Sequence, residues 1–206
     1  MKIVLKRFSP VLFVWVFFLT VSQVAMAVDS KDPGLFSEEI EGIFSKKINE
    51  LQLILQDPII LEAIRASNVE HQGWSADTIS QLDKKFIGAK ASDPWIQSFM
   101  NNAAAQRLAE YRKSHQGYAE IFVTDSRGLN VCQTNKTSDY YQADEEWWVK
   151  TFNQGIGKTR HGDIEFDESA QSQAVSLYAP ILDGDSSKVI GVAKAVLKID
   201  QIKDEL

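Results

Sequence analysis

The sequence predicts an α+β fold, with helices in the first half of the chain and an antiparallel sheet in the second half. From position 35 to about position 114, apolar residues recur at steps of three and four, which is the period of a helix. From Tyr118 onward they alternate or form short runs bounded by turn residues, as strands do. Helices followed by strands are typical of α+β proteins with an antiparallel sheet.

The first half predicts four helices in succession. Residues 35–56 place their apolar side chains on one helical face, so that a long amphipathic helix is expected. Asp57-Pro58 starts a second, short helix through Ile64, because proline suits the first helical position. Ser75 can cap a third helix over 76–86, and Asp93-Pro94 starts a fourth that extends to about Ser114.

The second half predicts a hairpin and three further strands. Ile121-Phe122-Val123 opens the first strand, and Gly128 can take the positive φ that a tight turn requires before the chain returns. A short helix is expected over 143–152. Further strands are expected over 161–166, 173–181 and 189–197, and 199–206 reads as a short helix or tail. The expected architecture is therefore a five-stranded antiparallel sheet.

Length and charge narrow the class of protein. The chain has 206 residues, which favours one domain with a substantial core. Its formal net charge is -6, and no basic run occurs after the first seven residues, so we expect no nucleic-acid partner. Cys132 is the only cysteine, and its place in a strand predicts a small buried hydrophobic residue.

The first 27 residues have the features of a signal peptide. Lys2, Lys6 and Arg7 precede an apolar stretch over 11–21, and Ala25-Met26-Ala27 forms a cleavage site of the A-x-A kind. Cleavage would leave a periplasmic or secreted protein. The alternative is an uncleaved membrane anchor, although the stretch is short for a span of about 20 residues.

The loop after the hairpin is rich in groups that can hold a small ligand. Tyr140, Tyr141, Trp147 and Trp148 can form walls, and Gln142 and Asp144 can accept hydrogen bonds. Loops on rigid scaffolds frequently carry binding sites. The alternative is that these rings only cover a core.

This part of the sequence resembles the extracytoplasmic Cache sensor domains, the PhoQ/DcuS/CitA or PAS-like type. The resemblance is carried by Asp125, Gly128, Asn130, Val131, Thr134, the run from Thr137 to Glu145, Trp147, Asp167-Glu168-Ser169, Ala179-Pro180-Ile181 and Val189-Ile190-Gly191-Val192. It implies a single sensor domain over 28–206, mainly helical over 28–116 and with the sheet and ligand loop over 117–206. It also implies a PAS-like sheet along which the long first helix packs.

In this family the ligand lies between the sheet and the loop-helix segment after the second strand. The resemblance therefore adds Arg160, Asp163, Asp167 and Tyr178 to the loop residues as expected ligand contacts. Acidic groups can bind an amine and Arg160 a carboxylate, which suggests a zwitterion or a small organic acid. The amino-acid-binding subgroup has Arg-x-Trp-Tyr in this loop, whereas residues 139–141 and 146–148 of this chain contain no arginine.

The sequence contains no catalytic motif that would indicate an enzyme. It lacks H-E-x-x-H, a P-loop and G-x-S-x-G, and no cofactor is expected. His71 and His115 fall near helix ends, where a solvated or dipole-facing imidazole is usual. The catalytic alternative is a metal enzyme that uses His161, Asp163 and Glu165 at alternating strand positions.

The expected partners follow from the resemblance and from what the sequence lacks. It has no second hydrophobic span and no cytoplasmic module, so a free-standing periplasmic sensor would signal through a partner such as a membrane sensor protein. The first helix could mediate a homodimer. A scaffold without a ligand is the alternative. The final Lys-Asp-Glu-Leu and the sequon at Asn135 favour the ER lumen, but the lack of paired cysteines opposes that location.

Overall fold

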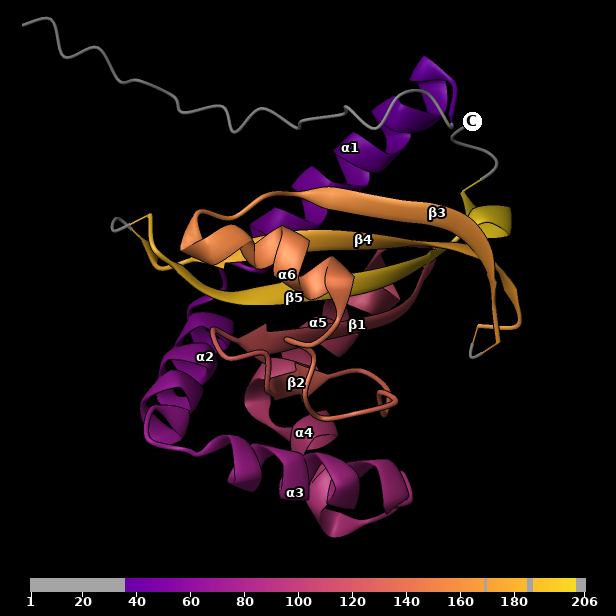
Figure 1. Ribbon diagram of the computed structural model, residues 1–206. Helices are drawn as coiled ribbons and strands as arrows, with labels where there is room; N and C mark the ends of the chain where they lie inside the picture. The colour runs from indigo at the N-terminus through magenta and orange to yellow at the C-terminus, as the bar shows by residue number, and fades with distance from the viewer. Residues whose placement is uncertain (1–35, 169, 185–186, 203–206) are drawn as a thin grey trace, which may run out of the picture.

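The computed structural model describes residues 36–168, 170–184 and 187–202. In this part of the chain the sheet has five antiparallel strands in the order β2-β1-β5-β4-β3 (Figure 1). Their bounds are β1 (Tyr118–Asp125), β2 (Asn130–Gln133), β3 (Arg160–Asp167), β4 (Ser172–Leu182) and β5 (Val189–Lys198). The α+β class with a five-stranded PAS-like sheet is confirmed.

The helices begin where the sequence places capping residues. Ser37, Asp57, Ser75 and Asp93 each accept a backbone N–H of the helix that follows. The helices are α1 (Glu38–Ile54), α2 (Pro58–His71), α3 (Ala76–Gly88), α4 (Pro94–Asn101), α5 (Ala103–Ser114) and α6 (Glu146–Phe152). Short 3-10 turns occupy Asn153–Gly155 and Ile199–Gln201.

The single helix expected from Asp93-Pro94 to Ser114 is wrong, because the chain breaks at Asn102. This residue is extended, with φ -68° and ψ 166°, and its side chain accepts the Ala105 N–H at 2.8 Å. Its amide nitrogen also donates to the Val131 carbonyl at 3.0 Å. The break therefore caps α5 and ties it to β2.

Helices cover the two faces of the sheet unequally. The main core joins α1, α2 and α5 to one face, through Phe44, Ile64, Leu108, Ile121 and Leu177 among others. The other face is covered by α6, which lies across the front of β4 and β5 in Figure 1. We call the second face the α6 face.

Neighbouring residues near the end of β1 show that the two faces are separate. Trp148 of α6 donates its indole N–H to the Thr124 hydroxyl at 2.8 Å, while Ser67 of α2 donates to the Asp125 carboxylate at 2.9 Å. Successive side chains of a strand point to opposite faces. The residues around Thr124 therefore lie on the α6 face, and those around Asp125 lie on the opposite face.

The hairpin turn fixes the start of the loop. Gly128 has φ +80°, and a Cβ there would lie 2.5 Å from the backbone nitrogen of Ala143. The Gly128 carbonyl also accepts the Gln142 N–H at 2.8 Å. Only glycine fits this close approach, as the turn pattern predicts.

Three further sequence expectations concern the chain ends, the single cysteine and a membrane span. The signal peptide over 1–27 and the final four residues lie outside the described residues. Cys132 is fully buried as predicted, and burial raises the pKa of its thiol. Among the described helices, none combines the length and the apolar character that crossing a membrane requires.

Candidate functional site

Three aromatic rings from different elements meet on the α6 face. Trp147 of α6 stacks on Tyr178 of β4, with ring centroids 5.2 Å apart and planes inclined by 14°. Phe122 of β1 meets Trp147 edge-on at 5.9 Å. Trp147 and Tyr178 are only half-buried, so that their rings are accessible from solvent.

A lysine lies against the stacked rings. The Lys194 ammonium is 5.3 Å from the Trp147 centroid and 6.0 Å from the Tyr178 centroid. The register of β5 explains this position, because Lys194 pairs with Phe122 on one side and with Tyr178 on the other. The aromatic faces attract the ammonium, and Lys194 is held half-buried beside them.

Glu120 lies two residues before Phe122 and therefore on the same face. Burial raises the pKa of its carboxyl from 4.5 to about 7, against the opposing charges of Lys194 and Arg112. Among the described residues, its carboxylate accepts no side-chain or backbone hydrogen bond. A carboxylate in this state can accept a hydrogen bond from a ligand.

The strand β3 adds charges at the edge of the same region. Arg160 pairs with Tyr178 across the ladder and is half-buried. Asp163 is exposed, and its charge and that of Arg160 act on the Tyr178 hydroxyl, whose pKa is raised chiefly by burial. Asp167 accepts the Ala170 N–H at 2.8 Å, and its charge contributes to the raised pKa of Glu120.

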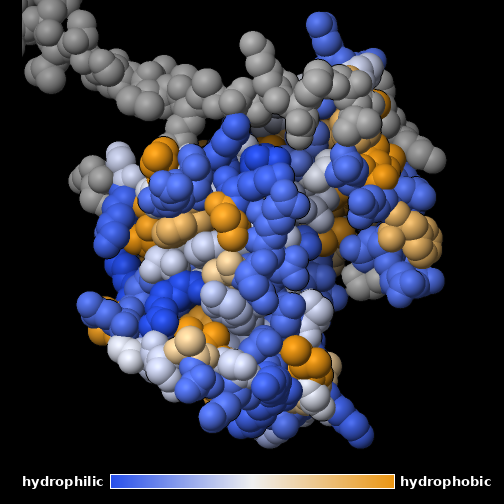
Figure 2. Space-filling view, in the orientation of Figure 1, coloured by the Kyte–Doolittle hydropathy of each residue, from blue (hydrophilic) through white to orange (hydrophobic). Residues whose placement is uncertain are grey.

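Together these groups offer an apolar wall, two cations and several carboxyl groups within one face. This combination suits a small molecule that has a carboxylate, an amine or both. Figure 2, which views this side of the molecule, shows hydrophilic residues over most of the surface, with small hydrophobic patches between them. In the described part of the chain, no group of three His, Cys, Asp or Glu side chains could hold a metal ion.

Three other loop residues occupy supporting positions. Trp148 is buried, stacks on Phe152 at 4.7 Å and donates to Thr124. Gln142 is buried and donates to the Asp139 side chain and carbonyl. Asp144 is exposed just before α6. Trp148 thus fixes α6 to β1, and Gln142 fixes the conformation of the loop itself.

The two tyrosines of the loop lie elsewhere. The backbone N–H groups of Tyr140 and Tyr141 donate to the Asp83 carboxylate of α3, at 2.8 and 3.0 Å. The Tyr140 ring packs against Phe86 and Phe99, with centroid distances of 5.8 and 5.4 Å. The structure therefore divides the predicted site residues between two places.

Sequence reasoning missed Glu120, Phe122 and Lys194. A signal for the last existed, because Lys194 is the only charged residue between Val189 and Leu197. A lone lysine in an apolar strand requires a partner or a functional reason, since lysine is seldom buried. Glu120 and Phe122 alternate with Ile121, but nothing local shows which face carries the site.

His71 and His115 lie at the ends of α2 and α5, as the sequence indicates, but the His71 imidazole is not solvated. His71 is buried rather than solvated, and its Nδ1 lies 2.6 Å from the Asp125 carboxylate. The Nε2 atom of His161 lies 3.0 Å from Glu41 of α1, on the face away from α6. The irregular pairing after His161 leaves Asp163 exposed, so these two residues and Glu165 do not converge in the described structure.

Comparisons with known proteins returned no matching family model and no matching curated protein. Similar solved structures include the sensor domain of Escherichia coli DcuS, with 18% identity and a TM-score of 0.38 over 63% of this chain and 92% of that chain. The sensory domain of the Campylobacter jejuni chemoreceptor Tlp3 has 13% identity and a TM-score of 0.39, over 81% and 64% of the two chains. The sensor domain of the Vibrio cholerae histidine kinase DctB has 10% identity and a TM-score of 0.38, over 81% and 60%.

These neighbours are sensor domains, the class that the sequence resembles. The chain spans less than two thirds of the Tlp3 and DctB domains. We base the functional proposal on the geometry of the α6 face.

Proposed function

We propose that this protein is an extracytoplasmic sensor module that binds a small organic ligand on the α6 face without transforming it. One observation carries the proposal. The stacked rings of Trp147 and Tyr178 hold the Lys194 ammonium beside them, and the half-buried carboxyl of Glu120, whose pKa is raised, lies on the same face.

The chemistry of these groups defines the ligand class. Lys194 and Arg160 attract a carboxylate, and Glu120 and Asp167 attract an amine. The ring pair contacts the apolar part of the molecule. A zwitterion or a small organic acid matches these groups best, and Asp144 and Asp163 contribute negative charge at the margin.

Signalling would follow from differential binding. A ligand between α6 and the sheet favours whichever position of α6 contacts it better, and a partner must distinguish the two positions. The sequence features support a periplasmic location and a membrane sensor protein as that partner. A homodimer through α1 would use its solvent side, where Leu53 is 78% exposed.

A ligand screen tests the proposal. The chain from residue 28 onward is screened by thermal shift against small carboxylates, amines and amino acids, because a ligand that binds the folded state raises the melting temperature. Each hit is then measured by calorimetry on wild type, Trp147→Ala and Lys194→Met.

Val149→Ala is the matched control, since Val149 lies on α6 but is 53% exposed. We expect the first two variants to lose binding and the control to retain it. Two results together would contradict the proposal. The screen would give no hits, and the protein would bind a membrane partner equally well as wild type and as Trp147→Ala. These results would support the scaffold alternative.

A further inference from the structure

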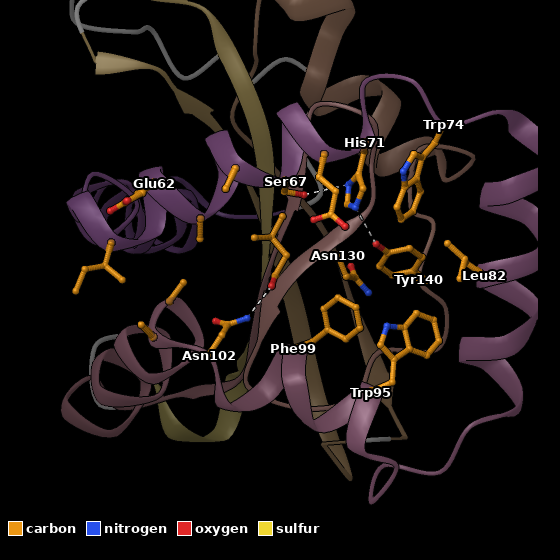
Figure 3. Close-up of a pocket in the computed structure, with 17 residues that line it drawn as sticks. Glu62, Ser67, His71, Trp74, Leu82, Trp95, Phe99, Asn102, Asn130 and Tyr140 are labelled. Carbon is orange, nitrogen blue, oxygen red and sulfur yellow. Dashed lines mark hydrogen bonds between the residues drawn. The ribbon is translucent and has the colours of Figure 1, made fainter.

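A cavity of about 510 Å³ lies on the α2 side of the sheet, opposite to α6. We call it the α2 pocket, because residues of α2 form one side of it (Figure 3). Its other sides come from α4, the start of α5, β2 and Tyr140. Small-molecule sites usually measure about 300–1,000 Å³, and this cavity falls within that range.

One end of the α2 pocket is aromatic. Figure 3 shows Trp74, Trp95, Phe99 and Tyr140 gathered at this end, with Leu82 beside them. The Tyr140 ring centroid is 5.8 Å from that of Trp95 and 5.4 Å from that of Phe99. Trp74, Trp95 and Phe99 are only half-buried, so that a ligand could reach their rings.

The polar corner of the pocket is a fixed hydrogen-bond network. The Asp125 carboxylate accepts the Arg127 and Leu129 N–H groups through one oxygen and the Ser67 hydroxyl through the other. That second oxygen is 2.6 Å from His71 Nδ1. A carboxylate only accepts, so Nδ1 carries the hydrogen.

This network leaves the other imidazole nitrogen for the pocket. His71 Nε2 lies 3.5 Å from the Tyr140 hydroxyl, a long distance for a hydrogen bond. The nitrogen can therefore accept a hydrogen bond from a ligand that enters between the two side chains. With the hydrogen on Nδ1, this corner of the pocket favours a ligand that donates a hydrogen bond to His71 Nε2.

The charged side chains that line the pocket are acidic, and two cations lie beside it: Arg127, which donates to the His71 and Trp74 carbonyls, and Lys85, which is 4.6 Å from the Trp95 ring centroid. The pocket lining includes Glu62 and Glu70 but no lysine or arginine. The charge of Glu70 reaches the aromatic end, because it raises the pKa of Tyr140 together with burial and Asp125. The phenol stays neutral, and the acidic side chains of the lining favour a cation over an anion.

We infer that the α2 pocket is a second ligand site, separate from the α6 face, and that it takes a small organic ammonium with an aromatic group. The Trp95 ring already holds the Lys85 ammonium 4.6 Å from its centroid, and the rings of Trp74 and Tyr140 can attract a cation in the same way. Glu70 and the accepting nitrogen of His71 provide the partners for its N–H groups. The site does not depend on Trp147, Tyr178 or Lys194.

Three probes of similar shape and different charge test this inference. Phenethylamine, 2-phenylethanol and phenylacetate are titrated by calorimetry into the chain from residue 28 onward. We expect phenethylamine to bind at least about tenfold more tightly than phenylacetate, since ion and cation–π contacts both favour it. The alcohol should fall between them.

Variants assign the binding to the pocket. Trp95→Leu should weaken phenethylamine binding about tenfold and Glu70→Gln about threefold, whereas Trp147→Ala should leave it unchanged. Glu70 is exposed, so its variant keeps the fold even if Trp95→Leu does not. The inference is overturned by equal binding of phenylacetate, by sensitivity to Trp147→Ala alone, or by no saturable binding of the amine at millimolar concentration. Sensitivity to Trp147→Ala alone would assign the amine to the α6 face, whereas the other two results leave the proposal for that face unaffected.

Discussion

At the scale of single residues, Glu120 is an acid whose pKa is strongly raised by its surroundings. Burial raises the pKa of its carboxyl from 4.5 to about 7, so the folded state binds this proton more tightly than the unfolded chain. Stability due to this group is therefore lost as pH rises from 4.5 through about 7. Above that range the charged carboxylate opposes folding.

We predict that Glu120→Gln stabilises the protein at about pH 8 and changes stability little at about pH 4. Partial contact with water reduces the effect, so we expect about 1–2 kcal/mol at the higher pH. Urea unfolding at both values measures it. Glu165→Gln on β3 is the control, since Glu165 is exposed. An equal gain at both pH values would show that charge is not the cause.

Asp125 and His71 form a buried hydrogen-bonded pair between β1 and α2. Asp125 is fully buried and receives four hydrogen bonds from α2, the hairpin turn and His71. We predict that Asp125→Ala destabilises the protein by about 3–5 kcal/mol, because it leaves donors buried without an acceptor. Guanidinium unfolding measures this. A loss below about 1 kcal/mol would mean that the network is not required for stability.

At the scale of elements, the break at Asn102 joins the helical half to the sheet. We predict that Asn102→Ala destabilises the protein by about 1–3 kcal/mol, because it removes a helix cap and the bond to Val131. Asn101→Ala is a matched control, since Asn101 is exposed and its side chain donates to Gln97 of its own helix, while its carbonyl, which the substitution keeps, accepts from Gln106. Equal urea midpoints for the two variants would contradict the assigned role.

Local signals explain which elements could be predicted from the sequence. Ser75, Asp57-Pro58 and Gly128 act on their neighbours in the chain, so capping and turn chemistry identified them. The break at Asn102 was missed because Ala103, Leu108 and Tyr111 continue a helical period. Its decisive partner, Val131, is distant in sequence.

The difference between local signals and distant contacts also explains which residues of the candidate site could be predicted. Trp147, Tyr178 and Arg160 were expected from the sequence, and they lie together on the α6 face. Tyr140 was expected beside them, but Asp83 binds its backbone and α3 and α4 enclose its ring. A contact between an α3 carboxylate and a loop backbone leaves no periodic signal in a sequence.

At the scale of the whole molecule, the sheet separates two regions with different charge. The α6 face presents Lys194 and Arg160 beside carboxyl groups, whereas the α2 pocket is lined by acids without a lysine or arginine. If both proposed sites bind their ligands, the protein responds to two kinds of molecule. Its output then depends on how α6 and α2 are held in each state.

The central claim is that the α6 face holds a small solute, and a crystal structure with the strongest screening hit tests it most directly. We predict that the ligand lies between α6 and the sheet, in contact with Trp147, Tyr178 and Lys194. A ligand bound elsewhere, with the Trp147 and Tyr178 rings still stacked and the α6 face empty, would contradict the claim.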